Sequence, residues 1–290
     1  MTLAKAAAKN ATAFVSGANR GIGLAVIRAL CRELGSDASV YLGARNLAQG
    51  QQAAESLAST GLNATPVRFD LTDAATHGAL AERVGSSGLD VLVLNGAYAA
   101  RPGVPAKDQV RVMIEANNHG NLAALETLAP HLNENARVLV VASGFGTLDN
   151  LPEAVRPKLG APDATPEQIE AAMDDYVLAV EAGRETEEGW PEWINLPSKV
   201  AQVATVRAFV RRWDQDPQRP SGVLINAVCP GWTDTDAARP YLAEMPDVDA
   251  QTPDEAAVDL LWLATLPAGV SEPHGELIRH RKVLSFEAET

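Results

Sequence analysis

The stretch ATAFVSGANRGIGLAVIRALCREL, residues 11–34, decides the fold of this chain. Residues 11–17 form a short apolar run that ends in glycine, which predicts a buried strand. Apolar side chains recur at helical spacing over residues 22–34, which predicts a helix. Gly17, Gly21 and Gly23 lie between the strand and the helix or open the helix. This order predicts the first part of a βαβ unit, with a turn open enough for a phosphate to approach the backbone.

Strands and helices continue to alternate along the rest of the chain. We expect further strands at 39–46, 64–73, 89–97, 136–146 and 222–232, and a possible seventh at 275–284. Helical patterns cover 47–60, 76–85, 105–132, 196–213 and 252–266. This alternation predicts an α/β fold of the Rossmann type, a doubly wound parallel sheet of about seven strands with helices on both faces.

One domain over residues 1–290 accommodates the whole chain, because no linker or repeat interrupts it. The stretch 147–188 is rich in Asp and Glu and precedes the helix expected at 196–213. We expect this stretch to be a helical insertion that covers the substrate mouth like a lid.

The composition excludes several classes of partner and site. A net charge of −13 disfavours binding to nucleic acid. No stretch approaches the ~18 apolar residues of a membrane span, and the start of the chain has no apolar signal segment. The two cysteines and five histidines show no metal-ligand spacing and form no disulfide framework. We therefore expect a cytoplasmic protein with no bound metal.

The end of the second strand bears on the choice of cofactor. An NAD-preferring site usually carries an acidic residue there, which binds the ribose 2′-hydroxyl. This chain has Gly43-Ala44-Arg45 instead, and Arg45 together with Arg20 could pair with a 2′-phosphate. The sequence thus predicts NADP(H). Asp70, at the end of the third strand, is expected either to contact the adenine edge or to cap a helix.

Several motifs resemble those of the short-chain dehydrogenase/reductase family. SGANRGIG (16–23) is similar to its T-G-x-x-x-G-x-G turn, and LNGA (94–97) to its N-N-A-G. Asn117–Gly120 matches N-x-x-G, ASGFG (142–146) matches S-S-x-x-G, and Pro230-Gly231 matches the P-G after the sixth strand. The motifs occur in the family's order over nearly the whole chain.

Within this family the chain resembles the monomeric carbonyl reductases. They share a long insertion before the catalytic helix, an EGWP segment (188–191 here), a CPGW segment (229–232) and an EPHGE-like stretch (272–276). The resemblance implies a monomer that reduces a small organic molecule.

The resemblance also implies roles for individual residues. In the family, a tyrosine gives a proton to the substrate oxygen, a serine holds that oxygen, a lysine lowers the tyrosine pKa, and an asparagine supports the lysine through water. Ser143, Lys199 and Asn117 match three of these positions. Counting from EGWP, the tyrosine position holds Asn195. The resemblance and the residues together assign cofactor binding to Gly17, Asn19, Arg20, Gly21, Ile22, Gly23, Arg45, Asp70, Leu71, Asn95, Gly96, Lys199, Pro230, Gly231 and Thr233.

Asn195 leaves the chemistry open, because an amide cannot release a proton at a useful pKa. A carbonyl could still be reduced if Ser143, a water linked to Lys199, or Tyr98 supplied the proton, whereas Tyr176 is expected to pack in the insertion. Alternatively, the substrate is an enone or an imine that needs no strong acid. The remaining hypotheses are a non-redox isomerase or lyase and a regulator that binds NADP(H). Asn195 is also a good N-cap for the helix that follows it.

Overall fold

Eight strands form one sheet in the order β3-β2-β1-β4-β5-β6-β7-β8. This computed structural model describes residues 10–288. The strands are β1 (Thr12–Val15), β2 (Ser39–Ala44), β3 (Thr65–Arg68), β4 (Leu89–Leu94), β5 (Leu132–Val141), β6 (Leu224–Val228), β7 (Leu277–Arg279) and β8 (Lys282–Leu284). All neighbours pair in parallel except β7 and β8, and the strand order reverses beside β1. The predicted doubly wound parallel sheet is confirmed, and ligands of such sheets bind where the order reverses, beyond the carboxyl ends of the strands.

The eighth strand comes from a tight hairpin. The sequence predicts one strand over 275–284, but the chain turns at His280 and Arg281, whose φ angles are 50° and 60°. Arg279 pairs with Lys282 across this two-residue turn. Positive φ at both positions is typical of the hairpin turn that matches strand twist. Neither residue is a glycine or an asparagine, so the sequence carries no signal for the turn.

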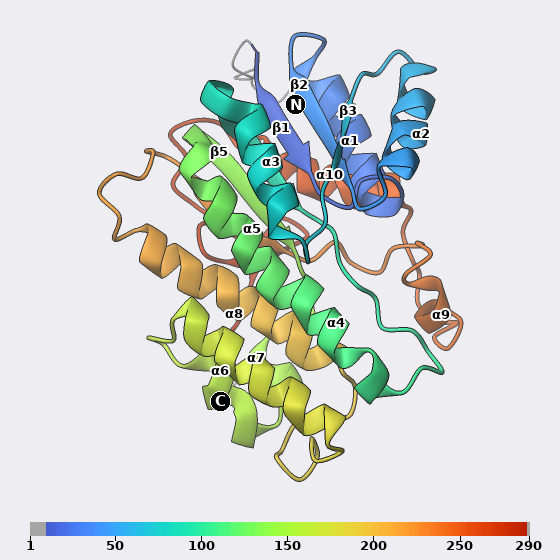
Figure 1. Cartoon of the computed structure of the whole chain (residues 1–290), viewed down its shortest axis with the longest axis vertical. Coiled ribbons are helices and arrows are strands. Elements are labelled where there is room, and N and C mark those ends of the chain that lie inside the picture. The colour runs from blue at the N-terminus through green and yellow to red at the C-terminus, as the bar shows by residue number, and fades with distance from the viewer. Residues whose placement is uncertain (1–9, 289–290) are drawn as a thin grey trace.

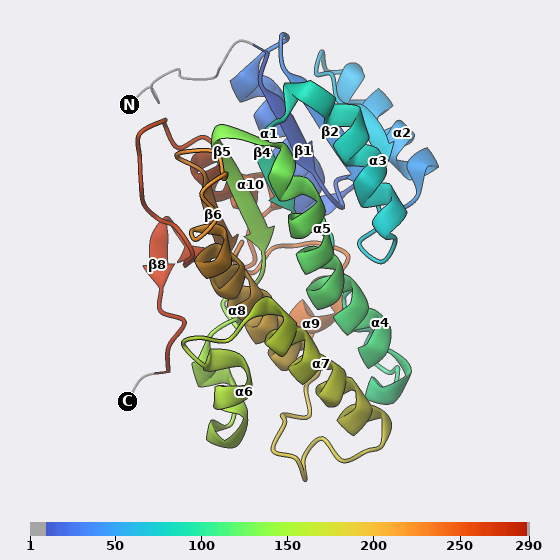
Figure 2. The same cartoon turned by 60° about the vertical axis from the view of Figure 1, so that its left-hand side comes forward.

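Helices cover both faces of the sheet, as the sequence predicts. One layer contains α1 (Gly21–Leu34), α2 (Leu47–Ala58) and α10 (Pro253–Ala264); the other contains α3 (Ala74–Val84), α4 (Val110–Ile114), α5 (Gly120–Leu128) and α8 (Asn195–Trp213) (Figures 1 and 2). Along β1, Phe14 packs into the second layer, while Ala13 and Val15 pack into the first. The strands therefore bury side chains on both faces, which explains their continuous apolar sequence.

The long helix predicted over 105–132 is interrupted where Asn117 lies. A π-helical turn, Glu115–His119, separates α4 from α5. Such turns widen a helix locally and often occur at functional sites. The turn leaves Asn117 and Asn118 buried and facing α8.

The insertion forms α6 (Arg156–Gly160) and α7 (Pro166–Glu181). α7 begins with a capping box made by Thr165 and Gln168, and it packs against α8 and α4 (Figure 2). Tyr176 of α7 lies 4.9 Å from Trp190, measured between ring centroids, and both side chains are buried. The insertion thus adds a layer on the helices that carry Asn117 and Lys199. Its effect on substrate access stays a prediction.

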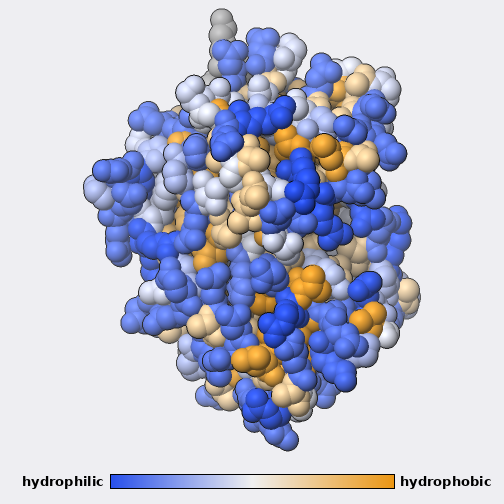
Figure 3. Space-filling model, viewed as in Figure 1, coloured by the Kyte–Doolittle hydropathy of each residue, from blue (hydrophilic) through white to orange (hydrophobic). Residues whose placement is uncertain are grey.

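The surface in Figure 3 is mostly hydrophilic, with separate small hydrophobic patches. Among residues 10–288, no helix has the length and apolar character that a membrane span requires. The start of the chain, for which the sequence predicts no signal segment, lies largely outside the described residues.

Arg137 is expected to be a major contributor to stability. Arg137 as a residue is 2% exposed, and its guanidinium donates hydrogen bonds to the carbonyl oxygens of Asn135, Ala136, Gly222, Leu266 and Pro267. Replacing Arg137 with methionine leaves these buried oxygens without donors, so we expect a loss of about 2–4 kcal/mol in the free energy of unfolding. Urea denaturation measures this change in the free energy of unfolding. The exposed Arg32→Met should change that free energy by less than about 0.5 kcal/mol, and an equal effect of both variants would contradict the prediction.

Candidate active site

The glycine-rich turn between β1 and α1 is packed so closely that only glycine fits. Gly17 and Gly21 have φ angles of 60° and 57°. A Cβ on Gly23 would lie 2.5 Å from the carbonyl oxygen of Gly17, and a Cβ on Gly17 would lie 2.6 Å from the Cα of Gly96. Asn95 Nδ2 donates to the carbonyl oxygens of Ser16 and Gly17 at 3.1 and 3.2 Å. Asn95 and Gly96 therefore hold the turn from the end of β4.

The start of α1 is suited to a dinucleotide pyrophosphate. Arg20 is the N-cap residue, but its side chain accepts no bond from the helix, and the first turn contains no acidic residue. The first backbone N–H groups of the helix thus keep their positive potential for an anion. Ile22 lies in this first turn and packs partly into the core. The donors present fit the phosphate groups of the predicted cofactor.

The two arginines predicted to bind a 2′-phosphate are placed differently. Arg45 is exposed at the end of β2, and the structure gives it no ion-pair partner within residues 10–288. Arg20 pairs with Asp236 at 2.8 Å, an exposed contact of small energy that a phosphate could replace. Asn19 directly precedes Arg20 and donates to Gln49 Oε1 at 3.2 Å.

Asp70 forms a turn of its own. Its Oδ1 accepts hydrogen bonds from the backbone N–H and the hydroxyl of Thr72, at 3.0 and 2.9 Å. Asp73, not Asp70, caps the following helix α3, so the helix-cap alternative for Asp70 is wrong. Leu71 is buried, and its carbonyl oxygen lies so close to Gly120 that a Cβ there would be 2.3 Å away. Contact of Asp70 with adenine stays a prediction.

The segment after β5 that carries Ser143 packs against α8, which carries Lys199. A Cβ on Gly146 would lie 3.0 Å from the carbonyl oxygens of both residues, so the two segments are in close contact. Ser143 is half-buried, and its Oγ accepts a hydrogen bond from the N–H of Phe145 at 3.2 Å. Lys199 Nζ donates to Gln202 Oε1 at 2.7 Å. Loss of solvent lowers the pKa of Lys199 to about 8, although the nearby Cys229 opposes this shift.

Asn117 joins the segment after β4 to α8. Its Oδ1 accepts from the N–H of Tyr98 at 2.7 Å, and its Nδ2 donates to the carbonyl oxygen of Tyr98 at 3.0 Å and to Ser198 Oγ at 3.4 Å. Both ends of the amide are thus engaged by protein groups. Support of Lys199 by Asn117 through water stays a prediction.

Asn195 is the first residue of α8, but it does not cap the helix. Ile194 is the N-cap residue, so the capping expectation is wrong. Asn195 Nδ2 instead donates to the hydroxyl of Tyr241 at 3.2 Å. Tyr241 belongs to the short helix α9 (Arg239–Leu242) after β6, and sequence reasoning missed it.

A row of aromatic rings extends from Tyr241. Phe145, after β5, lies 5.2 Å from Trp193 and 6.0 Å from Trp232, and Trp193 lies 5.9 Å from Tyr241, measured between ring centroids. These rings give an apolar wall beside Ser143 and Asn195. An organic substrate with a flat apolar part could pack there.

The loop after β6 lies over the glycine-rich turn. Gly231 has a φ angle of 79°, and Thr233 Oγ1 donates to its carbonyl oxygen at 3.2 Å. Gln251 Nε2 donates to the carbonyl oxygen of Pro230. A Cβ on Gly21 would lie 3.5 Å from the methyl group of Thr235. Thr235 of this loop therefore lies beside the start of α1, and binding of the cofactor by Pro230, Gly231 and Thr233 stays a prediction.

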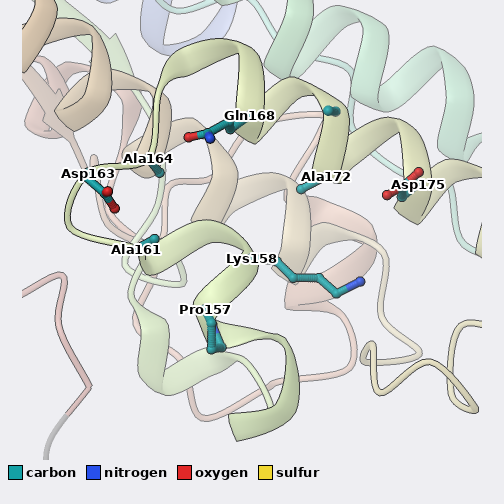
Figure 4. A pocket seen from close by; sticks show the side chains of 9 residues that line it. Pro157, Lys158, Ala161, Asp163, Ala164, Gln168, Ala172 and Asp175 are labelled. Atoms are coloured by element: carbon teal, nitrogen blue, oxygen red, sulfur yellow. The ribbon is translucent and has the colours of Figure 1, made fainter.

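A surface pocket of about 410 Å³ lies elsewhere, between α6 and α7 (Figure 4). Four of its nine lining residues are alanines, and Lys158, Asp163 and Asp175 are the charged ones. All its lining residues come from the insertion, so this pocket is separate from the candidate catalytic residues.

Comparison with known proteins identifies the family of this chain. Residues 11–154 match the family model of short chain dehydrogenases. Over 280 residues the chain is 31% identical to Carbonyl reductase [NADPH] 1 of Sus scrofa. This alignment covers 94% of this chain and 93% of that protein. This chain belongs to the short-chain dehydrogenase/reductase family. It is also 32% identical to Carbonyl reductase [NADPH] 3 of Mus musculus, over 94% of this chain and 98% of that protein.

Solved structures share the fold of this family member. Salutaridine reductase from Papaver somniferum aligns with a TM-score of 0.79 at 22% identity, over 92% of this chain and 99% of that one. Menthone neomenthol reductase from Mentha piperita aligns with a TM-score of 0.74 at 22% identity, over 93% of this chain and 98% of that one. At this identity the likeness concerns the fold alone.

Proposed function

We propose that this protein uses NADPH to reduce the carbonyl group of a small organic compound. The observation that carries the proposal is the contact of the Ser143 and Lys199 segments beside an aromatic wall, in a chain similar over most of its length to carbonyl reductases named for NADPH. An exposed Arg45, with no acid at the end of β2, supports NADPH over NADH.

In this proposal, residues of the chain bind and orient the cofactor and polarise the carbonyl group of the substrate. The glycine-rich turn and the start of α1 hold the pyrophosphate, and Lys199 of α8 binds the nicotinamide ribose. When bound, the reduced nicotinamide supplies a hydride equivalent to the carbonyl carbon. Ser143 Oγ donates a hydrogen bond to the carbonyl oxygen, and the Lys199 ammonium stabilises the negative charge that develops there.

A second candidate is the reduction of an enone or an imine. The amide of Asn195 supports it, because Nδ2 can polarise an oxygen by hydrogen bonding but cannot protonate it. An iminium carbon already carries charge, and an enone takes its proton at carbon from water.

The loss of NADPH absorbance tests the proposal, with the purified protein and separate quinones, diketones, enones and cyclic imines. We expect consumption with a quinone or diketone, and at least about tenfold lower kcat/KM with NADH in place of NADPH. Turnover with enones or imines alone would replace the proposal by its second candidate. Binding of NADPH without turnover of any compound would favour a non-redox enzyme or a regulator.

We also propose that the protein acts as a monomer in the cytoplasm. Packing of α7 against α8 and α4 supports the monomer, because it occupies a helical surface that would otherwise be open to a second subunit.

A further inference from the structure

Three segments meet at the hydroxyl group of Tyr241. The hydroxyl donates to the carbonyl oxygen of Ala100, after β4, at 2.7 Å. It accepts a hydrogen bond from Asn195 Nδ2, at the start of α8, at 3.2 Å. Tyr241 itself comes from α9 and is half-buried. A phenol thus lies in direct contact with the side chain that occupies the family's tyrosine position.

We infer that Tyr241 is the proton donor of the carbonyl reduction proposed above, and the inference rests on that proposed function. A phenol has an ordinary pKa of about 10 and can give a proton to an oxygen that is becoming an alkoxide, whereas an amide cannot. Asn195 then has a positioning role: its Nδ2 holds the phenol oxygen and stabilises the phenolate that remains after transfer.

The other three tyrosines are poorly placed for this role. Tyr176 is 0% exposed against Trp190, and burial raises its pKa above the usual range of a phenol. The hydroxyl of Tyr98 is shielded from solvent and has no hydrogen-bond partner among the described residues. Tyr41 lies on β2, under the guanidinium of Arg83. Tyr98, the candidate favoured by sequence order, is thus replaced by Tyr241.

Contacts around α9 hold Tyr241 near the cofactor turn. Arg239, two residues before it, pairs with Asp234 and Asp236 at 2.7 Å each. Asp236 also pairs with Arg20 of the glycine-rich turn at 2.8 Å. The Tyr241 ring packs against Trp193.

Atoms and electrons balance in the proposed step. As the carbonyl carbon is reduced and the nicotinamide is oxidised, the electron pair of the C=O π bond moves to oxygen. The O–H bond of Tyr241 breaks, and a new O–H bond forms on the product alcohol. The hydroxyl proton first turns from the Ala100 carbonyl oxygen toward the substrate oxygen. The phenolate regains a proton from solvent, and the amide of Asn195 is unchanged.

The test compares Tyr241→Phe with native protein and with the matched control Tyr41→Phe, using a carbonyl substrate that the native protein reduces. Phenylalanine keeps the ring against Trp193. We expect kcat to fall about 10²-fold in Tyr241→Phe, whereas the NADPH Kd, measured by fluorescence titration, changes less than about twofold. Tyr41→Phe should retain native kcat. Adding Asn195→Tyr to Tyr241→Phe should restore kcat at least about tenfold, because a phenol then occupies the neighbouring position.

A second variant, Asn195→Ala, keeps the phenol of Tyr241 and removes its hydrogen-bond partner. Asn195→Ala should lower kcat about 3–10-fold through loss of one hydrogen bond to the phenolate, again with unchanged NADPH Kd. Native reduction of carbonyls with unchanged kcat in both Tyr241→Phe and Asn195→Ala would overturn the inference and leave the proposed function standing. Absence of native turnover with every carbonyl would overturn the proposed function and this inference together.

Discussion

Replacing Lys199 with methionine is expected to lower kcat/KM for the carbonyl substrate by about 10³-fold. Methionine is close in length to lysine but carries no charge. The lost group is the ammonium of Lys199, which is shielded from solvent and donates a hydrogen bond to Gln202 Oε1 at 2.7 Å. In a site with little water, one fixed positive charge stabilises a developing alkoxide far more than it would in solution. Steady-state kinetics measures the fall in kcat/KM, and titration with NADPH shows how far weaker cofactor binding contributes to it.

The pKa of Lys199 adds a pH signature to this prediction. Burial lowers that pKa from 10.5 to about 8, so the ammonium is present below pH 8 and is lost as the pH rises through this value. Native kcat/KM should therefore decline above about pH 8, and Lys199→Met should lack this decline. The matched control is Lys282→Met, on the exposed edge strand β8, which should keep both the native rate and the native pH profile.

Stability distinguishes a catalytic loss from a folding defect. The folded-state pKa of Lys199 lies below its ordinary value of 10.5, so the folded chain binds fewer protons than the unfolded chain between pH 8 and 10.5. The buried charge costs folding free energy below pH 8, and this cost decreases as the pH rises. Lys199→Met should thus be at least as stable as the native protein at pH 7. A large drop in its Tm there would mean that the lysine is structural.

The fold could be predicted from the sequence because its signals are local and repeated. Buried parallel strands need apolar runs, and the crossover helices need their own periodicity, so strand–helix alternation predicts the sheet. The glycine-rich turn is equally local, since Gly17, Gly21 and Gly23 lie between a strand and a helix. The β7–β8 hairpin could not be predicted, because His280 and Arg281 adopt positive φ without the usual turn residues.

The site could be predicted only where one segment carries the signal. Ser143 and Lys199 follow from motifs within single segments. The partner of Asn195 does not, because Tyr241 is 46 residues away in a segment shaped by ion pairs of Arg239 rather than by hydrophobic periodicity. The pairing of Arg20 with Asp236 is also long-range, because the two positions are 216 residues apart in the sequence. Such contacts depend on the packed sheet and its loops.

Replacing Gly23 with alanine is expected to weaken NADPH binding by about 100-fold, which corresponds to about 2.7 kcal/mol. The added Cβ would lie 2.5 Å from the carbonyl oxygen of Gly17 and 2.6 Å from Asn95 Nδ2. The carbonyl oxygen of Gly17 and the amide of Asn95 cannot both move away from the added Cβ unless the turn that holds the pyrophosphate also shifts. Fluorescence titration with NADPH measures the change in Kd.

Gly78→Ala is the matched control, because both glycines lie within helices but a Cβ on Gly78 would meet no heavy atom within 4 Å. Alanine favours a helix over glycine by about 0.5–1 kcal/mol, so Gly78→Ala should be slightly stabilised and should bind NADPH as the native protein does. The two variants gain the same helix propensity, and only Gly23→Ala gains the clash. Equal NADPH affinity in both would therefore show that the close approach of Gly23 to Gly17 and Asn95 does not shape the cofactor site.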